Sequence, residues 1–109
     1  MNYSSMTKLL CALVLMVASS AQAAVQVFAC EPEWAALARE IGGDNIEAVS
    51  ATTALQDPHY IQARPSLIAG IRKADLLICS GAGLEAGWLQ ILLSKGSNPR
   101  VQAGQPGYL

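Results

Sequence analysis

Between residues 25 and 51 the sequence changes from strand to helix periodicity and back, and this alternation limits the fold more than any other feature. Val25–Cys30 (VQVFAC) is a β-branched and aromatic run of strand length. Pro32 suits a first helical turn, and Gly42-Gly43 suits a helix end. Ile46–Ala51 (IEAVSA) alternates like a second strand. These residues therefore predict a βαβ unit.

The alternation continues in the second half of the chain. Pro65 and Ser66 begin a predicted helix that ends near Arg72-Lys73, and Leu76–Cys79 (LLIC) is typical of a buried parallel strand. A third helix is predicted after Gly81-Ala82-Gly83, and the turn-rich remainder is expected to provide no closing element. The fold class that follows is α/β, a small parallel doubly wound sheet with flanking helices.

Apolar residues at helical spacing predict which sides of the three helices face the core. They are Trp34, Leu37, Ala38 and Ile41 in the first helix, Leu67, Ile68 and Ile71 in the second, and Leu84, Trp88, Ile91 and Leu92 in the third. Core packing is accordingly the expected role of both tryptophans.

The first residues are typical of a secretory signal peptide. Lys8 precedes the apolar run Leu9–Val17, and Ala21-Gln22-Ala23 is a small-residue cleavage signal. The run is about half as long as the roughly 20 residues of a membrane-spanning helix. We therefore expect residues 1–23 to be removed, no membrane span to remain, and residues 24–109 to form one periplasmic or secreted domain.

Charge and cysteine content narrow the classes of function. The formal net charge is −1 and no basic run is present, so nucleic acid is not an expected partner. Cys30 and Cys79 lie at the ends of predicted strands. Three alternatives remain open for them: two buried free thiols, a disulfide permitted by an oxidising compartment, or metal ligands.

The only histidine of the chain, His59, lies in a predicted loop, Thr52–Arg64, that is long for a compact α/β protein. Pro58 stiffens the backbone beside it. A neutral imidazole is a good ligand for Zn²⁺, and Asp57 is available to orient its other nitrogen. The residues alone favour a solvated or hydrogen-bonded loop histidine, because one imidazole does not make a zinc site.

Catalytic patterns are weak, and we expect no enzyme. Nucleophile candidates are Cys30, Cys79, Ser66 and Ser80, but each would have to use the single His59, and no G-x-S-x-G motif is present. Gly81–Glu85 (GAGLE) is neither a dinucleotide fingerprint nor a Walker A loop, since Ala86 replaces the third glycine and no G-K-[ST] follows. Tight strand–helix packing is the favoured explanation for its glycines.

Four segments in order resemble the N-terminal lobe of the zinc/manganese solute-binding proteins of metal ABC transporters. They are EIGGD (40–44), DPHYIQARPS (57–66), KADLLICSGAGLEAGW (73–88) and the turn-rich segment that follows. The resemblance covers nearly all of residues 24–109. It implies a protein of two α/β lobes with the metal held between them, of which this sequence would be the first, truncated before the linking helix and second lobe.

The resemblance implies that His59 is a metal ligand and that the remaining ligands come from later in the chain. The expected cargo is Zn²⁺, with Mn²⁺ as the alternative, and the expected partner is a membrane ABC permease. Glu31 would lie near the cleft, whereas no ligand role is transferred to Glu85 or Trp88. Two alternatives remain: a non-functional truncated fragment, or a minimal metal-binding or adhesin-like module that shares its site with a partner chain.

Overall fold

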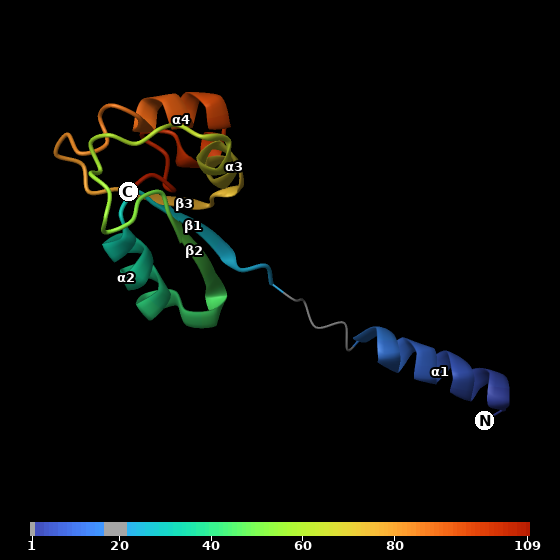
Figure 1. The fold of residues 1–109 in the computed structure, drawn as a ribbon. Helices are drawn as coiled ribbons and strands as arrows, with labels where there is room; N and C mark the ends of the chain where they lie inside the picture. Colours follow the sequence, from blue (N-terminus) through green and yellow to red (C-terminus); the bar gives the residue numbers. More distant parts are fainter. Residues whose placement is uncertain (1, 17–21) are drawn as a thin grey trace.

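The computed structural model describes residues 2–16 and 22–109. Its helices and strands follow one another in the predicted order (Figure 1). They are α1 (Tyr3–Met16), β1 (Val25–Ala29), α2 (Pro32–Gly42), the 3₁₀ turn η1 (Gly43–Asn45), β2 (Ile46–Ser50), α3 (Pro65–Lys73), β3 (Leu76–Ile78), α4 (Leu89–Gly96) and the 3₁₀ turn η2 (Pro99–Val101).

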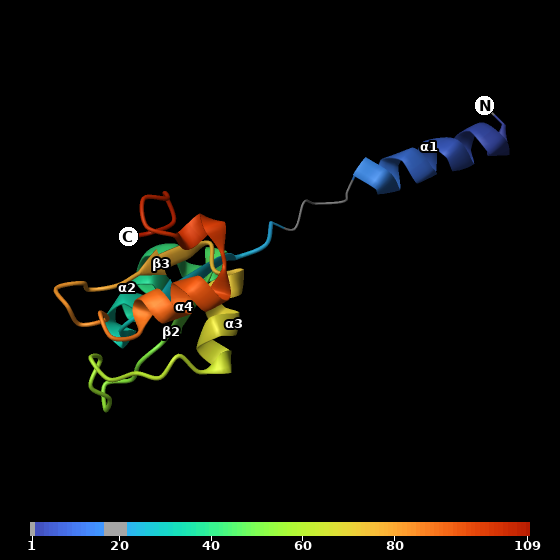
Figure 2. The same cartoon turned by 90° about the horizontal axis from the view of Figure 1, so that it is seen from above.

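The predicted parallel sheet is confirmed. Its three strands have the order β2-β1-β3, with Val25 opposite Ile46 and Phe28 opposite Leu77. Helix α2 lies on one face of the sheet, and α3 and α4 lie on the other (Figures 1 and 2). The chain places β2 on one side of β1 and then crosses back to place β3 on the other side. The carboxyl ends of β1 and β3 therefore form the switch point at which such folds bind ligands.

The core lies mainly between the sheet and the pair α3 and α4. Its largest fully buried side chains are Trp88, Phe28, Ile71, Leu77, Leu92 and Val101. Helix α3 buries Leu67 and Ile71 and partly buries Ile68, as its periodicity predicts. Apolar spacing therefore gave the correct side of this helix.

The predicted apolar side of α2 is only partly correct, because Trp34 and Ala38 are partly buried but Leu37 and Ile41 are exposed. Leu37 and Ile41 are 47% and 79% exposed, and the residue that α2 buries is Ala35, at 1%. A small side chain at the contact lets the helix backbone approach the sheet closely, and this rotates the larger residues outward. Trp34 is half-buried, and its Nε1 donates to Ser80 Oγ at 2.7 Å.

Helix α4 begins at Leu89, later than predicted, because the preceding residues form turns. Gly81, Ala82 and Gly83 all have positive φ, at 74°, 55° and 84°, which a right-handed helix does not allow. A Cβ on either glycine would meet nothing within 4 Å, so backbone conformation, and not the expected tight packing, explains why glycine is present.

The C-terminal segment closes one edge of the sheet, contrary to the prediction that it provides no closing element. Leu77 N donates to Gly107 O at 2.7 Å, and Leu109 N donates to Leu77 O at 2.9 Å. Tyr108 thereby pairs in parallel with Leu77. Unpaired backbone groups on β3 need partners, and a short extended segment supplies them despite the many turn residues before it.

Helix α1 lies apart from the sheet in both views (Figures 1 and 2). It has 14 residues, and among the residues that the structure describes no helix has the length and apolar character needed to cross a membrane. Of the predicted signal-peptide features, Val17 and Ala21 lie outside the described residues.

Candidate functional site

A disulfide joins the carboxyl ends of β1 and β3. Cys30 follows β1 and Cys79 follows β3, their Cα atoms are 4.8 Å apart, and 49 positions separate them in the sequence. Cys30 N donates to Ile78 O at 2.8 Å, so the backbones are paired at this point as well. Of the three alternatives left open by the sequence, the disulfide is therefore the correct one for the oxidised chain. Neither cysteine of this pair is then a free thiol that could act as a nucleophile.

Two buried carboxylates, Glu31 and Glu85, lie beside the disulfide and share one donor. Ser80 N donates to Glu31 Oε2 at 3.2 Å and to Glu85 Oε1 at 2.9 Å. Ser80 Oγ also donates to Glu31, at 3.0 Å, and Gly81 N donates to both oxygens of Glu85. Both carboxylates are only 3% exposed. Ser80 therefore organises a polar network at the switch point.

Glu31 is the member of this network whose hydrogen bonding is incomplete. Its Oε1 is buried and has no hydrogen-bond partner among the described residues. Burial, reinforced by the neighbouring Glu85 carboxylate, raises the pKa of Glu31 to about 7, although the hydrogen bonds from Ser80 oppose the shift. The carboxyl is therefore partly protonated near neutral pH.

The oxidised, metal-free chain should lose stability as the pH rises from about 4.5 to about 7. The folded state keeps the Glu31 proton up to the raised pKa, whereas the unfolded chain releases it near the ordinary value. The folded state therefore binds more protons in this window, and the free energy of unfolding falls as the pH rises.

Glu31→Gln should remove most of this pH dependence and be more stable than the wild type above the window. Urea unfolding followed by circular dichroism, at several pH values and with a chelator present, measures the effect. Glu33→Gln, which changes an exposed carboxylate of α2, is the matched control and should keep the wild-type slope. An equal slope in Glu31→Gln and the wild type would show that Glu31 is not the responsible group.

Hydrogen bonds attach the loop between β2 and α3, residues 51–64, to the rest of the domain. Thr52 Oγ1 donates to Cys30 O at 2.9 Å, and Trp88 Nε1 donates to Pro58 O at 2.7 Å. Gly87 lies so close to the loop that a Cβ there would be 3.3 Å from His59 O. The contacts with Gly87 and Trp88 place the backbone of Pro58 and His59 against the start of α4.

His59 pairs with Asp57 within this loop. Asp57 Oδ1 accepts from His59 N at 3.0 Å and lies 2.7 Å from His59 Nδ1. The backbone hydrogen bond from His59, with a further contribution from its ring, lowers the pKa of Asp57. An ionised carboxylate only accepts, so Nδ1 carries the proton of a neutral imidazole and Nε2 is the nitrogen with the free lone pair. The imidazole is 53% exposed, so that lone pair is presented in a form suited to a metal ion.

The structure brings some candidate residues together and keeps others apart. Among residues 2–16 and 22–109, one group of three or more metal-ligand side chains is close enough to share an ion: Cys30, Cys79 and Glu85. His59 does not belong to this group. Ser66 is exposed and accepts from Arg64 Nε at 3.1 Å, so it has no base beside it.

Glu85 is the site residue whose role the sequence did not predict. The sequence did contain an indication of this role, because a carboxylate four residues after Gly81 can reach back to the free backbone N–H groups of a glycine turn. Periodicity assigned this stretch to a helix instead, and in a helix Gly81 and Glu85 would have been stacked on one face. The positive φ angles at 81–83 give the carboxylate its actual partners.

Comparison with known proteins shows which solved structures share this fold. Among solved structures, 25% identity and TM-scores of 0.61 and 0.62 relate the chain to ZnuA and to a ZnuA deletion mutant with zinc bound. Each match covers 69% of this chain, but only 28% and 29% of the other. A mutant of a metal-free periplasmic metal binding protein from Candidatus Liberibacter asiaticus shares the fold, with 23% identity, a TM-score of 0.57, and coverage of 61% and 24%.

The chain therefore spans less than a third of the length of each of these solved proteins. Comparison with curated protein sequences gives no match. A family model, described as zinc-uptake complex component A periplasmic, matches residues 27–106, which include both strand ends, the His59 loop and the Glu85 turn. On this match over most of its length, the chain belongs to the ZnuA family of periplasmic zinc-uptake components.

Proposed function

We propose that this chain is the amino-terminal lobe of a periplasmic solute-binding protein that captures Zn²⁺ and delivers it to a membrane ABC permease. Mn²⁺ is the alternative cargo, and no reaction is catalysed. The family match and the shared fold support a role in metal uptake. One observation supports the proposal at the level of a residue: the Asp57 carboxylate lies 2.7 Å from His59 Nδ1, which leaves Nε2 of a neutral imidazole free to bind a metal.

His59 is one donor of the proposed capture site. Zinc sites in proteins use three or four protein ligands, so the site needs donors beyond this imidazole. His59 is exposed, which is what a ligand at the face between two lobes requires. Acidification should weaken capture, because protonation of the imidazole removes the lone pair that binds the metal.

Export is part of the same proposal. Residues 1–23 would act as a signal peptide that is cleaved near Ala23, leaving a lobe that spans residues 24–109. The apolar character of the first helix and the small residues after it support this assignment. The family to which the chain belongs is described as periplasmic, which is the compartment that such a signal reaches.

Zinc titration of the purified oxidised chain, followed by nuclear magnetic resonance of the backbone amides and of the histidine side-chain nitrogens, tests the role of His59. We expect a weak site whose shifts are centred on His59 Nε2, and His59→Ala should abolish it. Asp57→Asn should weaken binding by about 10- to 100-fold, because the ring loses the carboxylate that orients it.

Asp44→Asn is the matched control for Asp57→Asn, since it removes another exposed negative charge from the chain and should leave the titration unchanged. The long-range nitrogen spectrum of the metal-free chain should also show the proton on Nδ1. Zinc-induced shifts that persist in His59→Ala, or a proton on Nε2, would contradict the assignment of His59.

A further inference from the structure

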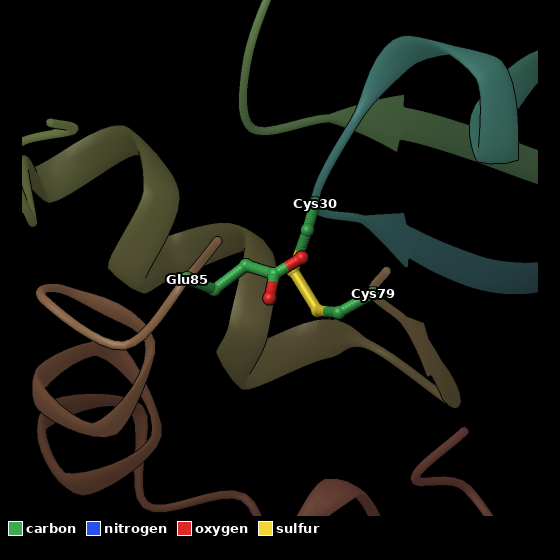
Figure 3. A group of neighbouring side chains, drawn as sticks. All are labelled: Cys30, Cys79 and Glu85. Atoms are coloured by element: carbon green, nitrogen blue, oxygen red, sulfur yellow. A yellow bond between two sulfur atoms is a disulfide. The ribbon is translucent and has the colours of Figure 1, made fainter. Parts of the chain in front are cut away.

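The cluster of Cys30, Cys79 and Glu85 has the composition of a metal site. One ligand atom from each residue lies within 4.8 Å of the others. They come from three separate places, the ends of β1 and β3 and the turn before α4, and Figure 3 shows the Glu85 carboxylate reaching toward the disulfide. Thiolates and carboxylates are ordinary Zn²⁺ ligands, and three protein ligands suffice when water completes the coordination.

Glu85 is already held in position for such a role. The backbone N–H groups of Ser80 and Gly81 donate to its two oxygens at 2.9–3.3 Å. A carboxylate has about four lone-pair sites, so these hydrogen bonds leave room for a metal. They also resemble the outer hydrogen bonds that orient ligands in established metal sites.

The surroundings of the cluster favour a cation. Cys30 and Glu85 are buried, and the partly buried Cys79 connects them to the surface. Glu31 Oε1 lies in the same Ser80 network, is buried, and has no donor among the described residues. An oxygen acceptor left without a partner in a buried site is satisfied by a proton or by a positive ion.

We propose that reduction of the Cys30–Cys79 disulfide creates a second metal site, in which the two cysteine thiolates and the Glu85 carboxylate bind one Zn²⁺. The reductant is a dithiol. It supplies two electrons and two protons, the Cys30–Cys79 bond breaks, and the dithiol becomes a disulfide. Zn²⁺ then displaces the two thiol protons, because only the thiolates bind the metal.

The bound ion would replace the disulfide as the link between β1 and β3. Metal binding at this site would thus depend on the redox state of the chain, while the His59 site would not. The two sites use different residues, since His59 does not belong to the cluster. Failure of one assignment therefore leaves the other testable.

Cobalt(II) and zinc titrations of the reduced and oxidised chain test the proposal. A phosphine is the suitable laboratory reductant, because a dithiol would itself bind the metal. We expect the reduced chain to bind one Co²⁺ with the near-ultraviolet charge-transfer absorption of cobalt thiolates, and the oxidised chain to show none. Zinc affinity, measured by competition with a chromophoric chelator, should rise by more than about 100-fold on reduction.

Variants separate this site from others. Cys79→Ser should abolish the charge-transfer signal, and His59→Ala should leave it unchanged. Glu85→Gln keeps an oxygen acceptor for the Ser80 and Gly81 N–H groups but loses the carboxylate, so it should weaken zinc binding by at least about tenfold. Equal zinc affinity in the reduced and oxidised chain, or in Glu85→Gln and the reduced wild type, would overturn the proposal.

Far-ultraviolet circular dichroism during the titration covers the case in which the reduced chain unfolds. The proposal then requires zinc to restore helical signal in the wild type, and to do so at higher concentration in Glu85→Gln. Zinc could instead bind without restoring helical signal, and with the same affinity that the reduced chain has in urea. The metal would then be held by two cysteines of an unfolded chain, and this result would contradict the proposed folded site.

Discussion

Trp88→Ala should lower the free energy of unfolding by roughly 3–5 kcal/mol, the cost of removing a buried aromatic side chain and leaving a cavity. Trp88 is 1% exposed and is the largest of the fully buried side chains. Its Nε1 also donates to Pro58 O at 2.7 Å, so the substitution releases the His59 loop as well. Urea unfolding followed by circular dichroism measures the loss, which is a large part of the total stability of a domain of this size.

Two further variants separate the contribution of the Nε1 hydrogen bond from that of core packing. Trp88→Phe keeps an aromatic ring in the core but removes the Nε1 donor, so it should cost about 1–3 kcal/mol and make the loop more mobile by hydrogen exchange. Ile91→Ala changes a 46% exposed residue of the same helix and should cost less than about 1 kcal/mol. A loss in Trp88→Ala no larger than in Ile91→Ala would contradict the central place of Trp88 in the core.

Loss of the disulfide should cost a similar amount. Cys30 and Cys79 are 49 positions apart, and opening a loop of that length is expected to lower the free energy of unfolding by roughly 4 kcal/mol. The double variant Cys30→Ala with Cys79→Ala avoids a buried hydroxyl and leaves little unfilled space. Chemical denaturation without added metal measures the difference from the oxidised wild type.

Reductant provides the control for this variant. It should destabilise the wild type to nearly the level of the double variant and should leave the double variant unchanged. If reductant lowered the stability of both proteins equally, or of neither, the bond between β1 and β3 would not be the stabilising element.

Local sequence patterns predicted the elements whose conformation depends on neighbouring residues. The three strands and helices α2 and α3 occur where periodicity, proline and glycine placed them. The Asp57–His59 pair is also local, since the residues are two positions apart. Imidazole chemistry made His59 a candidate metal ligand with Asp57 beside it, and the family resemblance favoured that role over a solvated loop histidine.

Errors arose where a contact between distant segments decided the outcome. Ala35, and not Leu37 or Ile41, faces the sheet, because close approach of the helix to the strands selects the small residue. The C-terminal segment pairs with β3 because that edge has free backbone groups, which cannot be read from its own turn-rich residues. The late start of α4 follows from the left-handed conformation of 81–83.

The sequence by itself determined the alternating strands and helices, the parallel sheet, and His59 on a stiffened loop. Only the tertiary structure decided that Cys30 bonds to Cys79, and that Glu31 and Glu85 share the N–H of Ser80. The physical reason is the strand order. Moving from β2 back across β1 to β3 brings the carboxyl ends of β1 and β3 together, so residues about fifty positions apart become neighbours.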